Sequence, residues 1–141
     1  MNITKITKWF DEQTILATEW PVFRSNEEYD IESSREKSAF HHKYLRTSII
    51  PFNTRVASVG KHGLDELRGI YQIDIFVPVE NGIDESNYIS DAILNHFELK
   101  THIVDDDTCI RVVNRSPSIS RKTDNLMMLV CEVEWSSHYQ R

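Results

Sequence analysis

The chain has 141 residues, enough for one domain with a single hydrophobic core. Its apolar fraction of 40% and charged fraction of 27% are typical of folded globular proteins and argue against extensive disorder. Proteins that bind duplex nucleic acid concentrate lysine and arginine, so the net charge of −6 argues against specific nucleic-acid binding. No apolar run approaches the ~20 residues of a membrane-spanning helix, and no secretory signal opens the chain. We therefore expect one cytoplasmic domain over residues 1–141 with no membrane partner.

The first predicted element is an amphipathic helix over residues 3–18. Asn2 suits its N-cap, and Lys8, Asp11 and Glu12 lie opposite the apolar arc. That arc contains Ile3, Ile6, Trp9, Phe10, Leu16 and Ala17. The helix must end before Pro21, because a residue that precedes proline leaves the helical region.

A short edge strand is expected at residues 22–24, followed by a long polar segment over residues 25–42. We interpret this segment as an exposed loop. Loops of this length are uncommon in compact domains, and it is either a functional surface or a solvated insertion.

The next stretch predicts an antiparallel hairpin. Residues 44–50 alternate as a strand, which Pro51 and Asn53 interrupt before residues 54–59 resume an extended course. Gly60 and Gly63 mark a turn, and residues 70–77 alternate again.

A second amphipathic helix is predicted at residues 87–97, with Asp84, Glu85 and Ser86 at its start. Three aspartates at 105–107 indicate a turn, which precedes a strand at 109–113 and a loop at 114–125. The last predicted strand covers residues 126–135.

This order predicts an α+β fold in which two helices pack on one face of a central, mainly antiparallel sheet. The opposite face is more apolar than a free surface should be. Either another subunit contacts it, or the long loop or the termini fold over it. Its apolar candidates for such a contact are Ile70, Phe76, Leu126, Met128 and Val130.

Motifs of reactive chemistry are missing from the sequence. No phosphate-binding glycine loop, zinc-ligand spacing or nucleophile elbow occurs, and His96 in the apolar arc of the second helix suggests a hydrogen-bonded core or interface residue. Cys109 and Cys131 are interpreted as small hydrophobic residues of a reducing compartment. We expect neither an enzyme nor a bound cofactor or metal.

One basic cluster is present, formed by Arg111, Arg115, Arg121 and Lys122. It is either a contact for an acidic partner surface or an ordinary solvated loop.

Two segments carry a resemblance to a known family: residues 68–78, with the sequence RGIYQIDIFVP, and residues 89–97, with Ile89, Ile93 and Phe97. Together with Trp20, Phe23 and the strand that ends near Trp135, they resemble small proteins of phage and prophage tail operons. That family is similar to the tail terminator, or tail completion, proteins of long-tailed phages.

The resemblance implies a homohexameric ring that caps the growing tail tube, stops its polymerisation and provides the head-joining surface. The implied partners are other copies of the chain, the major tail tube protein and a head–tail connector protein, and no cofactor is needed. Isolated copies are expected to stay monomeric until a tube is present. The implied location is the cytoplasm of the bacterial host during assembly and then the virion tail or neck. The apolar residues of the open face and the basic cluster named above become candidate contacts for another subunit or for the tube.

Two alternatives to a terminator stay open. One is another neck or connector component, and the other is a small enzyme or ligand-binding domain that uses His41, His42 or His96. The 25–42 segment departs from the family pattern.

Overall fold

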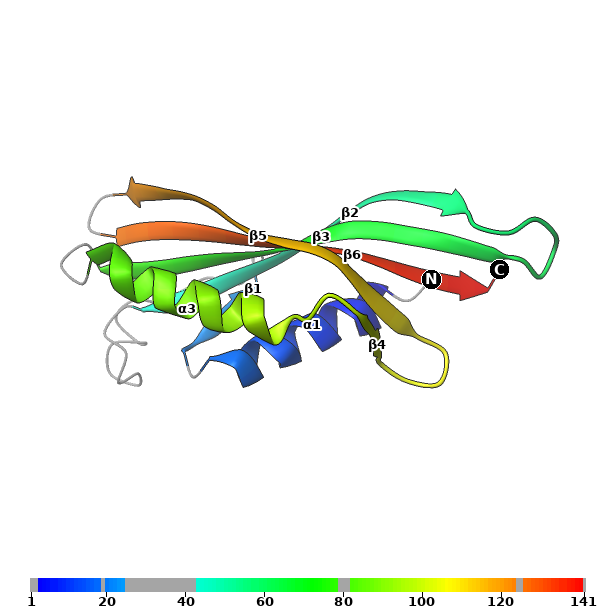
Figure 1. The fold of residues 1–141 in the computed structure, drawn as a ribbon, viewed down its shortest axis with the longest axis horizontal. Coiled ribbons are helices and arrows are strands. Elements are labelled where there is room, and N and C mark those ends of the chain that lie inside the picture. Colours follow the sequence, from blue (N-terminus) through cyan, green and yellow to red (C-terminus); the bar gives the residue numbers. More distant parts are fainter. Residues whose placement is uncertain (1–2, 19, 25–42, 79–81, 124–125, 141) are drawn as a thin grey trace.

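The computed structural model describes residues 3–18, 20–24, 43–78, 82–123 and 126–140. Its elements, in chain order, are α1 (Ile3–Ala17), β1 (Val22–Arg24), β2 (Tyr44–Val56), β3 (Leu64–Pro78), α3 (Gly82–His96), β4 (Thr101–Ile103), β5 (Cys109–Thr123) and β6 (Leu126–Gln140) (Figure 1). The predicted loop at 25–42 and the proposed cap Asn2 lie outside the described residues.

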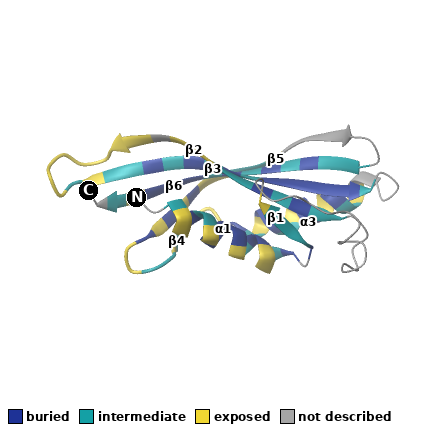
Figure 2. Cartoon of the chain, turned by 180° about the vertical axis from the view of Figure 1, so that it is seen from behind, coloured by how far each residue is buried: buried dark blue, intermediate teal, exposed yellow. Residues whose placement is uncertain are grey.

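All six strands belong to one twisted sheet with the order β1-β2-β3-β6-β5-β4. Every neighbouring pair is antiparallel except β1 and β2. Both helices lie on the same face of this sheet, as the two opposite views show (Figure 1, Figure 2). The predicted α+β class, with a mainly antiparallel sheet and two helices on one face, is confirmed.

The core lies between that sheet face and the two helices. Alternate residues of β3 and β6 point into it, because successive side chains of a strand alternate between faces. Phe10 of α1 stacks on Tyr71 of β3, with ring centroids 4.6 Å apart, and Phe97 packs beside both rings. Full burial of one such side chain stabilises the fold by about 1.5–3 kcal/mol. The buried apolar residues on this face of the sheet are Leu45, Leu67, Tyr71, Ile73, Ile75, Val77, Ile110, Val112, Leu129, Cys131, Val133 and Trp135.

Gly69 permits a close approach between neighbouring strands and the Trp135 indole. A Cβ atom there would lie 2.7 Å from the carbonyl oxygen of Ile50 and 2.7 Å from the indole of Trp135. Since real Cβ atoms do not approach so closely, the indole can cover β3 only where glycine leaves space for it.

Several predicted strand boundaries are wrong. β3 begins at Leu64 rather than at residue 70, and β6 continues to Gln140 rather than ending at residue 135. β2 does not stop at Pro51 but continues to Val56, and the irregularity is absorbed by a register shift between Pro51 and Asn53. The loop predicted over 114–125 is instead strand as far as Thr123, because β5 pairs with β6 along its length. Pro117 is tolerated there because it lies at a register shift on a strand whose far side is unpaired within the described residues.

The helices also differ from the prediction in detail. α3 begins at Gly82, so Asp84 and Glu85 lie in its first turn rather than before it. On α1, Leu16 is 72% exposed although it was assigned to the apolar arc, whereas Asp11, which was assigned to the polar side, is buried. The short strand β4, which includes His102, was not predicted.

Candidate assembly surfaces

The open sheet face, on the side away from the helices, has an apolar half. Tyr44, Phe76 and Met128 form one row across β2, β3 and β6. The rings of Tyr44 and Phe76 are stacked 4.6 Å apart at 10°, and the guanidinium of Arg46 lies 5.1 Å from the centroid of Phe76. Phe76 is therefore buried within its own chain, while Met128 and Val130 stay half-buried.

Ile70 does not belong to this apolar half. It pairs with Ile50 and Glu134, and the rows that hold Gln72 and Asp74 lie between it and Phe76. Asp74 is buried and accepts hydrogen bonds from the Arg46 side chain at 3.3–3.4 Å and from Gln72 Nε2 at 2.9 Å. The structure thus brings together Phe76, Leu126, Met128 and Val130 and leaves Ile70 on the far side of a polar strip.

The other half of the open face is charged but internally balanced. The Glu66 carboxylate lies 3.3 Å from Arg68, 3.6 Å from Arg55 and 3.2 Å from His138. Arg68 also reaches Glu134 at 3.8 Å. The Glu66 side chain is only 12% exposed, whereas its arginine partners Arg68 and Arg55 are 30% and 65% exposed, and the opposite charges largely cancel. This half therefore offers no strong net charge to a partner.

The predicted basic cluster is distributed along β5 rather than gathered in a loop. Arg111 is exposed at the start of the strand, and Arg115 donates hydrogen bonds to the carbonyl oxygens of Leu94 and Phe97 at the C-terminal end of α3. A cation at a helix C-terminus is stabilising, so Arg115 acts as a helix cap. The backbones of Arg121 and Lys122 pair with Met128 and Met127, and their side chains lie outside the described part of the structure.

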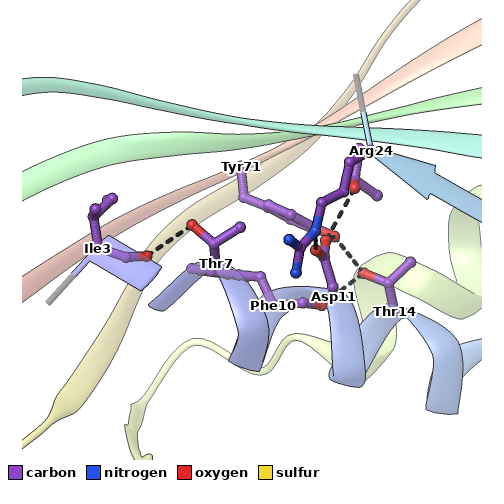
Figure 3. A network of polar contacts seen from close by, with 8 residues as sticks. Ile3, Thr7, Phe10, Asp11, Thr14, Arg24 and Tyr71 are labelled. Atoms are coloured by element: carbon purple, nitrogen blue, oxygen red, sulfur yellow. Dashed lines mark hydrogen bonds and ion pairs between the residues drawn. The ribbon is translucent and has the colours of Figure 1, made fainter. Parts of the chain in front are cut away.

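A buried polar network joins α1 to three strands, and sequence reasoning missed it (Figure 3). Asp11 accepts hydrogen bonds from the hydroxyls of Thr47 and Tyr71 at 2.9 and 2.7 Å, and Arg24 Nε donates to it at 2.6 Å. Thr14 lies 3.0 Å from the same Tyr71 hydroxyl. Burial, and then the negative charge of Asp11, raise the pKa of Tyr71 well above 10.0. Asp11, Thr14, Thr47 and Tyr71 are buried, whereas the Arg24 side chain is 49% exposed, and the network holds α1 and β1 against the sheet.

The histidine and cysteine side chains of the described residues do not come together in one site. His96 lies 2.7 Å from Gln13 and is half-buried, as the sequence suggested, and His41 and His42 lie outside the described residues. Cys109 and Cys131 are both free thiols. Within residues 3–18, 20–24, 43–78, 82–123 and 126–140, no three His, Cys, Asp or Glu side chains are arranged to hold a metal ion.

A cavity of about 500 Å³ lies between the N-terminal half of α1, the 105–108 turn and the far ends of β3 and β6. Its lining mixes apolar side chains, such as Leu67 and Tyr139, with Asp106 and Asp107. Lys5 at this cavity pairs with Asp105 at 2.7 Å. No helix among the described residues has both the length and the apolarity to cross a bilayer.

These features define a small α+β protein with a one-sided helix layer, an exposed sheet face and long sheet edges. A family model described as phage tail terminator protein matches residues 3–135. The chain belongs to this family, whose members are structural proteins of phage tail assembly. The resemblance noted from the sequence is thereby confirmed.

Comparison with solved structures supports the fold. One solved protein superposes with a TM-score of 0.72 at 16% sequence identity, covering 97% of this chain and 96% of its own. No curated protein matches the sequence.

Proposed function

We propose that this protein caps the growing tail tube as a homohexameric ring, stops its polymerisation and presents the surface to which the head connector joins. Family membership supports this role, and the observation that carries it is the apolar half of the open sheet face. Met128 and Val130 are half-buried there, beside the buried ring of Phe76, on the side opposite both helices. A partially exposed apolar patch of this kind is typical of an interaction surface.

The mechanism is steric. The ring occupies the polymerisation surface of the last tube ring, so no bond is made or broken and no cofactor is required. A ring closes when each copy presents two different patches to its neighbours, with a rotation that returns to the start. In this proposal the apolar half docks on the tube protein, and assembly takes place in the host cytoplasm before the cap becomes part of the virion.

The experiment is a capping assay with purified tail tube protein. Polymerisation is followed by light scattering and electron microscopy, with this protein added after growth has begun. We expect growth to stop at a ratio of about one ring per tube end. The variant Met128→Lys should cap at least about tenfold less efficiently, because an unpaired lysine would be buried at the contact.

The matched control is Leu99→Lys, at an exposed position between α3 and β4. It should cap like the wild-type chain. Equal capping by Met128→Lys, with both variants folded by circular dichroism, would contradict the assignment of the docking face.

A further inference from the structure

Two long sheet edges remain unpaired within the described part of the chain, and they are on opposite sides of the sheet. β1 pairs only with residues 45–47 of β2, so residues 48–56 have an open outer side. β4 pairs only with residues 109–111 of β5, and Val112 N donates to the Lys100 carbonyl, so residues 113–123 are open. Open edges are templates for pairing with another strand.

Exposed apolar side chains accompany these open segments. On β2, Ile50, Phe52 and Val56 are 45%, 48% and 63% exposed. On β5, Val113 is 39% exposed. Apolar exposure along an unpaired edge points to a protein occupant.

The two edges are complementary to each other. Because neighbouring strands from β2 to β5 are all antiparallel, β2 and β5 run in opposite directions. A second copy in the same orientation therefore brings its β2 antiparallel to the β5 of the first. The short strands β1 and β4 do not obstruct this contact. β1 covers only residues 45–47 of β2 and β4 covers only residues 109–111 of β5, and the contact uses neither range.

One pairing register between β2 of one copy and β5 of the next keeps the paired side chains on the same face of the continued sheet. If Val56 of one copy lies beside Val113 of the next, Thr54 falls beside Arg115, and both are on the helix-covered face by their pairing with Leu67 and Val133. The register shifts that follow Pro51 and Pro117 then meet opposite each other. This alignment shifts successive copies along the strands by four or five residues, about 15 Å at ~3.3 Å per residue. A stagger of this kind is what a sheet needs in order to close on itself.

We propose that neighbouring copies join edge to edge, with residues 48–56 of one copy hydrogen-bonded to residues 113–121 of the next, so that one sheet continues around the ring. This inference rests on the proposed ring and specifies the contact that closes it. The contact is heterologous, as closure of a ring from identical copies requires.

The first test is hydrogen–deuterium exchange of the full-length protein, free and assembled on tail tubes. We expect amides in both edge segments to exchange at least about tenfold more slowly in the ring, while those of the central strand β3 change little. Rings without protection at either edge would overturn the edge contact and leave capping intact. Protection of only one edge would assign it to the tube protein and also overturn the proposal, and failure to form rings would overturn both.

The second test uses charge at the aligned positions. Val56→Lys and Val113→Glu should each reduce ring formation about tenfold, and the double variant should recover most of it, because the two side chains meet across the contact. Val59→Lys is the matched control, since Val59 is 95% exposed in the β2–β3 turn beyond the segment. No recovery in the double variant, or an equal loss in the control, would reject the alignment.

Discussion

Replacing Asp11 by alanine should destabilise the fold by about 3 kcal/mol, a large part of the ~5–15 kcal/mol that a domain usually has. The side chain is 10% exposed and accepts three hydrogen bonds. Each bond to a charged group contributes about 1.5–3 kcal/mol, but these values do not add fully. The Tyr71 hydroxyl retains Thr14 as a partner, whereas the buried Thr47 hydroxyl loses Asp11, which sets our value at the upper end of the range for one such bond.

Urea unfolding followed by circular dichroism measures this change as a lower midpoint at constant m-value. Asp11→Asn, which retains an oxygen but loses the charge, should cost about half as much. The neighbouring Glu12, with its side chain 58% exposed, is the control, and Glu12→Ala should stay within about 0.5 kcal/mol of wild type. If Asp11→Ala also stayed within that range, the network would not be the anchor of α1.

Four further predictions follow from buried or constrained groups. Because the pKa of Tyr71 is raised in the folded protein, the unfolded chain loses the phenol proton at a lower pH. The free energy of unfolding should therefore be constant in this respect below pH 10 and fall above it, and urea titrations at several pH values should show a smaller fall for Tyr71→Phe. Gly69→Ala should cost about 1–3 kcal/mol in urea unfolding, because a methyl group would overlap a β2 carbonyl and an indole, and an unchanged midpoint would refute the close contact. Arg115→Ala should lower the unfolding free energy by about 1–2 kcal/mol through loss of the α3 cap, with Arg111→Ala as the exposed control that should show no such loss. Ellman's reagent should label Cys109 in the folded protein and Cys131 only after unfolding, since burial raises the pKa of Cys131 to about 11; rapid labelling of both thiols, compared with Cys109→Ser, would contradict that burial.

The sequence was sufficient where local periodicity and burial coincide. The alternation of Tyr71, Ile73 and Ile75 predicts both a strand and its buried face, and β6 follows the same rule. It was insufficient where the role of a residue depends on a contact with a residue far along the chain. Asp11 looks like a surface residue because its acceptor role depends on Thr47 and Tyr71, which are 36 and 60 residues away.

The same limit applies to the second half of β5. Its serines and Pro117 are typical of a loop, but pairing with β6 extends the strand through them. For the candidate surfaces, the sequence placed Phe76, Met128 and Val130 on the face opposite the helices. The same alternation along β3 already places Gln72 and Asp74 between Ile70 and Phe76, and the register adds that Asp74 pairs with Val130. The helix-capping role of Arg115 follows from contacts 18 and 21 residues away, which no local pattern indicates.

If this protein ends tail growth, its loss must change tail length. The decisive measurement is the distribution of tail lengths, by electron microscopy, in particles from a phage that carries this gene and from the same phage with the gene deleted. We expect tails well beyond the normal length and without heads, restored to normal length when the protein is supplied in trans. Tails of normal length that merely fail to join heads would contradict this role and identify a joining factor instead.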